Sequence, residues 1–159
     1  MTIDDFGART GTAVVTGGSG GLGAAICRML AARGSDVALT FHRNNAAAAA
    51  VVGDVEKSGR QAQAWPLDLV DEAATLRFLD EVAERFGGIH SLIHASGPHV
   101  AQLHLSKVRP EQYRRQLEEE AVGFFNLLQP ALPHLRATRG SIVAVTTAAT
   151  RRYPVRDGL

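Results

Sequence analysis

Segments typical of β-strands alternate with segments typical of α-helices along this chain of 159 residues. Runs rich in β-branched and apolar residues predict strands at residues 12–16, 36–41, 61–67, 89–95 and 140–147. Helical spacing and end signals predict helices from residue 22 to Gly34 and at residues 44–58, 71–86 and 110–137. This alternation favours parallel strands joined by right-handed helical crossovers, with helices on both faces. The predicted fold class is α/β, a doubly wound parallel sheet of about five strands.

The apolar residues of the predicted helices define candidate buried faces. The first helix carries Leu22, Ile26, Met29 and Leu30 at helical spacing. The third carries Leu76, Leu79, Ala83 and Phe86, and the fourth carries Leu117, Ala121, Phe124, Leu128, Leu132 and Leu135. Pro130 and Pro133 are expected to kink the last part of the fourth helix. Residues 96–109 are expected to form a loop.

Composition excludes several classes of function. The net charge of +1 does not favour a nucleic-acid partner, which needs clustered basic residues. No apolar run approaches the roughly 18 residues of a membrane helix, so no membrane partner is expected. Cys27 is the single cysteine, which favours the reducing cytoplasm. The histidines have no metal-ligand spacing, so we expect no metal site.

A glycine-rich segment, Thr-Gly-Gly-Ser-Gly-Gly-Leu-Gly at residues 16–23, follows the first predicted strand and opens the first predicted helix. Glycines allow the sharp turn, and the absence of side chains lets a diphosphate approach the backbone. The helix N-terminus then offers free N–H groups and a partial positive charge to the phosphates. The segment therefore predicts a dinucleotide site, the alternative being a glycine-rich turn without a ligand.

This segment resembles the cofactor loop of the short-chain dehydrogenase/reductase family. The resemblance extends along nearly the whole chain. Within the family, the sequence is most similar to the type of the 3-oxoacyl-carrier-protein reductases. It implies a Rossmann fold and assigns these loop residues to the cofactor: Thr16, Gly17, Ser19, Gly21, Leu22 and Gly23. Asp68 and Leu69 resemble the family's pair that contacts the adenine. His94 and the cofactor-binding candidates Ala95, Ser96 and Gly97 fall where the family has Asn-Asn-Ala-Gly.

The end of the second predicted strand bears on the choice of cofactor. A carboxylate there takes the ribose hydroxyls of NAD, whereas a basic residue accommodates the 2′-phosphate of NADP. His42 and Arg43 follow the strand, with no carboxylate, so we favour NADP(H) over NAD(H). Alternatively Arg43 is a solvated loop residue. Gly20 argues against NADP, because relatives that prefer NADP often carry an arginine there.

The resemblance implies hydride transfer between nicotinamide and a carbonyl or alcohol carbon of a small molecule, although the substrate itself is not readable. Thr147 takes the place of the family's catalytic serine and is the candidate catalytic residue; alternatively it is a strand-end threonine. The family also uses a Tyr-x-x-x-Lys motif, in which the lysine tunes the tyrosine as a proton donor. Tyr113 and Tyr153 are followed four residues later by Leu117 and Asp157, so this sequence contains no such motif.

The resemblance places that motif near or beyond Leu159. We therefore expect residues 1–159 to be a single NAD(P)-binding domain, incomplete at its C-terminal end, inactive alone and part of a homo-oligomer at full length. The fifth strand is then an uncovered edge. The alternative function is a non-catalytic dinucleotide-binding sensor or partner subunit. Glu120 stands where the family has an Asn; alternatively it belongs to a solvated helix face. His94 is alternatively a strand-end histidine that is bonded to backbone.

Overall fold

The computed structural model describes residues 5–98, 100 and 102–147, and it contains one parallel sheet of five strands. The strands are β1 (Thr12–Thr16), β2 (Val37–Phe41), β3 (Ala62–Pro66), β4 (Ile89–His94) and β5 (Ser141–Ala144). Their order across the sheet is β3-β2-β1-β4-β5, and neighbouring strands are parallel. The predicted doubly wound α/β class is confirmed. The strand order reverses between β1 and β4.

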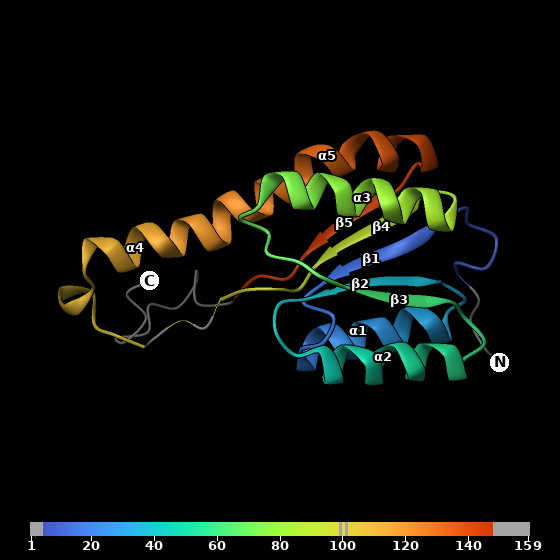
Figure 1. The fold of residues 1–159 in the computed structure, drawn as a ribbon, viewed down its shortest axis with the longest axis horizontal. Helices are drawn as coiled ribbons and strands as arrows, with labels where there is room; N and C mark the ends of the chain where they lie inside the picture. The colour runs from blue at the N-terminus through green and yellow to red at the C-terminus, as the bar shows by residue number, and fades with distance from the viewer. Residues whose placement is uncertain (1–4, 99, 101, 148–159) are drawn as a thin grey trace.

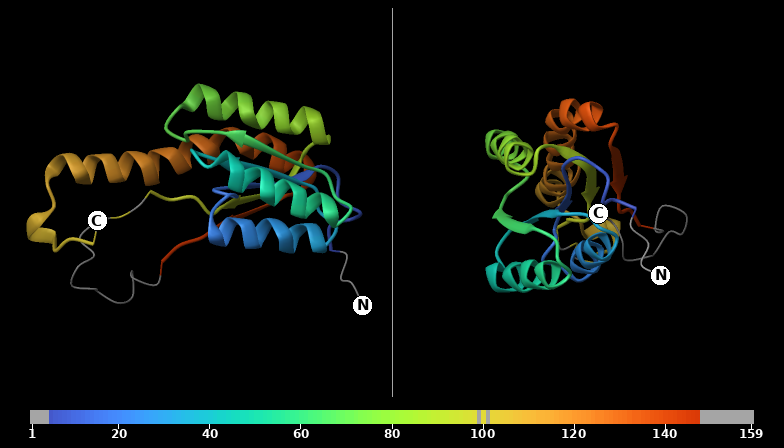
Figure 2. Two further views of the ribbon diagram at one scale, coloured as in Figure 1. Left: turned by 60° about the horizontal axis from the view of Figure 1, so that its bottom comes forward. Right: turned by 90° about the vertical axis from the view of Figure 1, so that its right-hand side faces the viewer.

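Helices cover both faces of the sheet (Figure 1). One face carries α1 (Gly21–Ala32) and α2 (Asn45–Lys57), and the other carries α3 (Glu72–Phe86) and α5 (Gly123–Thr138). The end-on view in Figure 2 shows the sheet as the middle of three layers. Each face has its own buried cluster: Cys27, Leu39 and Val51 belong to the first, and Leu79 and Leu127 to the second.

The helix ends follow the signals in the sequence. The Asn44 side chain accepts a hydrogen bond from the Ala47 N–H at 3.0 Å, and the Asp71 side chain accepts one from the Ala74 N–H at 2.9 Å. Both satisfy a donor that the first turn of a helix leaves without a partner. Gly87 ends α3 with a φ of +75°, the left-handed conformation that glycine adopts without strain.

The buried face of α1 differs from the predicted one. Leu22 and Met29 are 56% and 51% exposed. Apart from Leu30, the buried residues of α1 are all small: Gly23, Ala24, Cys27 and Ala31. Leu76 of α3 is likewise exposed, although Leu79 is fully buried. In α1 the small side chains let the helix lie close to the sheet, so residue size rather than hydrophobicity determines the buried face.

The predicted long helix over residues 110–137 is confirmed as one uninterrupted helical segment, although a π-helical turn lies in its middle. A helix α4 (Pro110–Leu117) is followed by a π-helical turn, η2 (Glu118–Val122), and then by α5. None of the described residues of α4 is buried, and Figure 1 shows α4 extending beyond the end of the sheet. The predicted loop before α4 contains a short 3₁₀ turn, η1 (Leu105–Lys107).

β5 forms one edge of the sheet and is shorter than predicted. Its four residues are exposed, as is Val145, whose N–H still donates to the His94 carbonyl at 2.9 Å. The expectation of an uncovered fifth strand is therefore confirmed for the part of the chain that the structure describes. Within that part, no helix is both long enough and apolar enough to cross a bilayer.

Candidate functional site

The glycine-rich segment forms the turn from β1 into α1, at the carboxyl end of the sheet. Gly17 has a φ of +67°, and a Cβ at this residue would lie 2.8 Å from the Ser96 Cα. A Cβ at Gly23 would lie 2.2 Å from the Gly17 carbonyl oxygen. The packing of the turn itself therefore requires glycine at both positions.

The N-terminus of α1 is open. Its N-cap Gly20 provides no side-chain hydrogen bond, and none of the residues in its first turn is acidic. A Cβ at Gly21 would meet no described atom within 4 Å, so the protein's own packing does not explain this glycine. Ser19 is half-buried and Leu22 exposed beside it. Free N–H groups, the helix dipole and open space together suit an anion such as phosphate.

Behind the turn, three polar side chains join the ends of β1 and β4. The Thr16 Oγ1 lies 3.0 Å from the His94 Nδ1, and the Ser96 hydroxyl donates to the same Thr16 oxygen at 3.0 Å. A hydroxyl can both donate and accept, so Thr16 can bond to His94 and Ser96 at the same time. The side chain of His94 thus bonds to side chains, contrary to the interpretation of a histidine bonded to backbone.

Two buried histidines make stability depend on pH. Burial lowers the pKa of His94, and burial followed by the charge of Arg9 lowers the pKa of His90. The unfolded chain therefore binds protons on these rings at a pH where the folded chain does not. We expect the unfolding free energy to have its highest value above pH ~6.5, the ordinary pKa of histidine. Below that pH it should fall by at most about 1.4 kcal/mol per pH unit for each histidine. The fall should end where the pH reaches the lowered pKa of the folded state.

Urea unfolding across this pH range measures the effect. We expect His94→Gln to reduce the dependence of the unfolding free energy on pH. A dependence that is the same in the His94 variant and in the unmodified chain would contradict the assignment.

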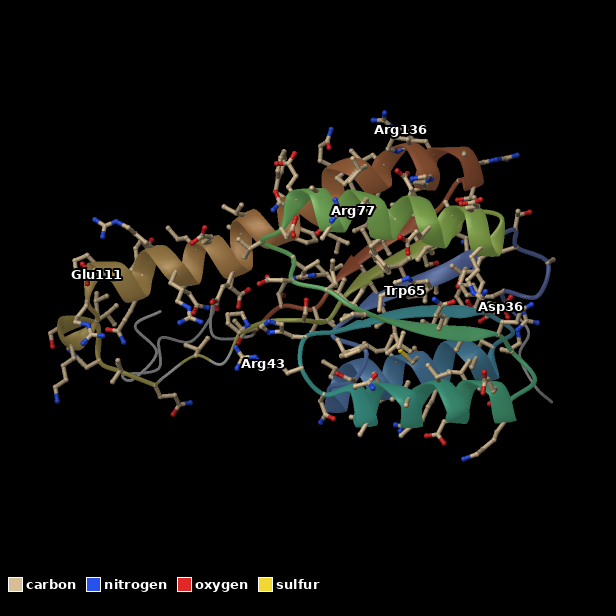
Figure 3. The ribbon with its side chains drawn as sticks, in the orientation of Figure 1. Asp36, Arg43, Trp65, Arg77, Glu111 and Arg136 are labelled. Carbon is tan, nitrogen blue, oxygen red and sulfur yellow. The ribbon has the colours of Figure 1, made fainter. Side chains whose placement is uncertain are left out.

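The residues after β2 and β3 lie at the same end of the sheet. His42 and Arg43 are exposed, and Figure 3 shows Arg43 beyond the end of β2, opposite Asp36 at the other end of this strand. The Asp68 carboxylate is exposed and accepts a hydrogen bond from the Val70 N–H at 3.1 Å. Leu69 is partly buried against the core beneath α5.

Asn126 is a site-supporting residue that the sequence analysis missed. Its Nδ2 donates to the Leu69 carbonyl at 3.0 Å and to the Val70 carbonyl at 3.3 Å. One turn before it, Gly123 lies against Leu69, since a Cβ at Gly123 would be 3.2 Å from the Leu69 Cβ. These contacts attach α5 to the loop that carries Asp68. The one signal in the sequence was an amide within the apolar stretch of a helix.

An open pocket lies beyond the ends of β4 and β5. Residues 95–97 and 145–147 form two of its walls, and Glu120 of η2 lies in the third. Ala95, Ser96, Gly97 and Thr147 therefore lie around one pocket. Glu120 is exposed, yet its carboxylate faces this pocket, where its Oε1 is 3.4 Å from the position of a Cβ on Gly97.

All of these groups lie at the carboxyl ends of parallel strands. The glycine turn follows β1, the basic residues follow β2, Asp68 follows β3, and the pocket follows β4 and β5. β1 and β4 are also the strands between which the order reverses. In open α/β sheets, the crevice at that reversal is where ligands bind. The arrangement therefore offers an extended site with the turn into α1 at its centre.

Comparison with known proteins gives consistent matches. An uncharacterised oxidoreductase of Methylorubrum extorquens is 35% identical over 139 residues, which are 87% of this chain and 55% of that protein. A short chain dehydrogenase from Burkholderia cenocepacia, solved in complex with NADP, is 34% identical, with a TM-score of 0.86 and coverage of 95% of this chain and 61% of that one. An NADH-dependent reductase solved with NAD, 24% identical, shares the fold, with a TM-score of 0.85 and coverage of 94% and 65%.

The chain spans about half the length of the curated relatives it matches, with 53%, 48% and 51% of three of them covered. Residues 11–156 match the family described as short chain dehydrogenase. This match includes all five strands and the glycine turn. The chain belongs to the short-chain dehydrogenase/reductase family.

Proposed function

We propose that residues 1–159 form a single NAD(P)-binding domain of an oxidoreductase that acts on a small carbonyl or alcohol compound. The observation that carries this proposal is the open N-terminus of α1, where Gly21 faces space that no described atom fills. The partial positive charge of a helix N-terminus would favour a diphosphate there. When bound, the nicotinamide cofactor would donate or accept the hydride.

The residues of the site divide into four groups along the carboxyl ends of the strands. The turn would hold the diphosphate with residues from both of its ends: Thr16, Gly17, Ser19, Gly21, Leu22 and Gly23. Asp68 and Leu69 would bound the adenine. Residues 95–97 would lie against the nicotinamide half, and the Thr147 hydroxyl would bind the substrate oxygen.

The exposed basic residues after β2 support NADP(H) as the preferred cofactor. A guanidinium that binds the 2′-phosphate makes a charge-assisted hydrogen bond, which NADH cannot form. We expect Arg43→Ala to weaken NADPH binding by about 10-fold or more, and to change NADH binding little. Titration of the purified chain with each cofactor, followed by nicotinamide fluorescence, measures both affinities.

Arg77→Ala is the matched control, because it removes the same charge from an exposed position on α3 (Figure 3). Equal loss of both cofactors in the Arg43 variant, or no loss, would reject the assignment of Arg43. If neither cofactor bound the unmodified chain, the cofactor site itself would be rejected.

The departures from the family's residues at Ala95, Glu120 and Thr147 favour a second candidate, a dinucleotide-binding sensor or partner subunit without catalysis. In either case, we propose that these 159 residues do not reduce a carbonyl alone. Carbonyl-dependent oxidation of NADPH by the purified chain would contradict that statement.

The remaining proposals concern the whole protein. The likeness to 3-oxoacyl-carrier-protein reductases is one of them. Homo-oligomer formation is another, supported by the exposed apolar side chains of Leu117 and Phe125 on α4 and α5. A cytoplasmic location is a third proposal, supported by the single cysteine, Cys27, which cannot form an internal disulfide.

A further inference from the structure

The charge in the pocket beyond β4 and β5 comes from one residue. Among the described residues that line it, Glu120 is the single ionisable group, and the others are small, apolar or hydroxyl side chains. The pocket therefore has a negative wall opposite neutral ones.

No described cation neutralises Glu120. The arginines of α4 pair with other carboxylates: Arg115 with Glu119 at 2.6 Å, and Arg114 with Glu111 at 3.8 Å. From the described residues Glu120 receives one hydrogen bond, which the neutral Gln116 amide donates from its Nε2 to the Glu120 Oε1 at 3.3 Å. Within the part of the chain that the structure describes, the Glu120 carboxylate therefore faces the pocket without an ion-pair partner.

Glu120 and its neighbour Glu119 face different parts of the molecule. Glu119 faces back along α4 to Arg115, whereas Glu120 lies in the wall of the pocket. Both residues belong to the π-helical turn η2. Single π turns within α-helices are frequently found at functional sites.

Our proposed function determines which end of a cofactor would reach this pocket. The diphosphate lies at the turn after β1, and the 2′-phosphate end lies toward Arg43 after β2. The other end then extends across the reversal of strand order to β4 and β5. That end carries the nicotinamide ring.

The two redox states of the nicotinamide ring differ in charge, because the oxidised ring is a cation and the reduced ring is neutral. We propose that Glu120 is a specificity-determining residue that makes this site bind the oxidised cofactor more tightly than a neutral side chain there would. The adenosine and phosphate contacts are common to both states. Their contributions therefore cancel in the ratio of the two affinities. The contribution of the Glu120 carboxylate does not cancel, because its charge attracts only the oxidised ring.

The test is to measure the dissociation constants of NADP⁺ and NADPH by calorimetry for the unmodified chain and for Glu120→Gln. The amide keeps the size of the side chain and removes its charge. We expect the preference for NADP⁺ over NADPH to fall by about 3- to 10-fold, an effect typical of a nearby charge in a partly solvated pocket. The difference between the variants should shrink at high salt.

Glu118→Gln is the control, since it removes the same charge from the same turn but does not line the pocket. A purely structural role for Glu120 would change both affinities by the same factor. An unaltered ratio in Glu120→Gln, with both cofactors still bound, would overturn this inference and leave the proposed function intact. Failure of the unmodified chain to bind either cofactor would overturn both.

Discussion

Replacing Gly21 with alanine should weaken NADPH binding by roughly 100-fold without destabilising the chain. No described atom lies within 4 Å of a Cβ at this position, so the fold has room for the methyl group. A diphosphate at the N-terminus of α1 would be displaced by that methyl group from the N–H donors. Losing charge-assisted hydrogen bonds worth about 3 kcal/mol corresponds to this fold-change.

Thermal unfolding and cofactor titration of the same preparation separate the two effects. Gly53→Ala is the control, because Gly53 lies inside α2 and also has no described atom within 4 Å of its Cβ position. It should raise the unfolding free energy by about 0.5–1 kcal/mol and leave binding unchanged. Normal NADPH affinity in a folded Gly21→Ala chain would mean that the open space at α1 is not a phosphate site.

The order of strands and helices was predictable because each boundary has a local cause. Asn44 and Asp71 cap their helices through hydrogen bonds within three residues, and Gly87 ends α3 by its own conformation. The parallel pairing follows from the alternation. Once β1 and β4 are neighbours, their register places Thr16 opposite His94, residues that are 78 positions apart.

The π turn was not predictable, because its cause is tertiary. Asn126 and Gly123 attach α5 to the loop after β3, whereas none of the described residues of α4 is buried. The two helices meet at η2, whose local sequence suits an ordinary helix. Glu120 lines the pocket together with residues 95–97 and 145–147, which come from distant parts of the sequence, so its place there could not be read from the helical pattern.

Replacing Gly23 with alanine, two residues beyond Gly21, should instead damage the fold and the site together. The added Cβ would lie 2.2 Å from the Gly17 carbonyl oxygen and 2.8 Å from the Gly17 carbonyl carbon. These are backbone atoms of a turn that itself packs against Ser96, so they cannot move aside as a flexible side chain would. We expect a loss of about 3 kcal/mol in unfolding free energy, at the upper end of the range for overpacked sites.

Gly21→Ala is the matched comparison, since the same methyl group is added to the same helix. Displacement of Gly17 would also shift the N–H groups that face the diphosphate, so cofactor binding should be lost in Gly23→Ala even at low temperature, where the chain remains folded. Urea unfolding and NADPH titration measure both consequences. If Gly23→Ala kept its full stability, the close packing of α1 against the turn would be wrong. If it lost stability but retained its affinity, the turn would not be what positions the diphosphate.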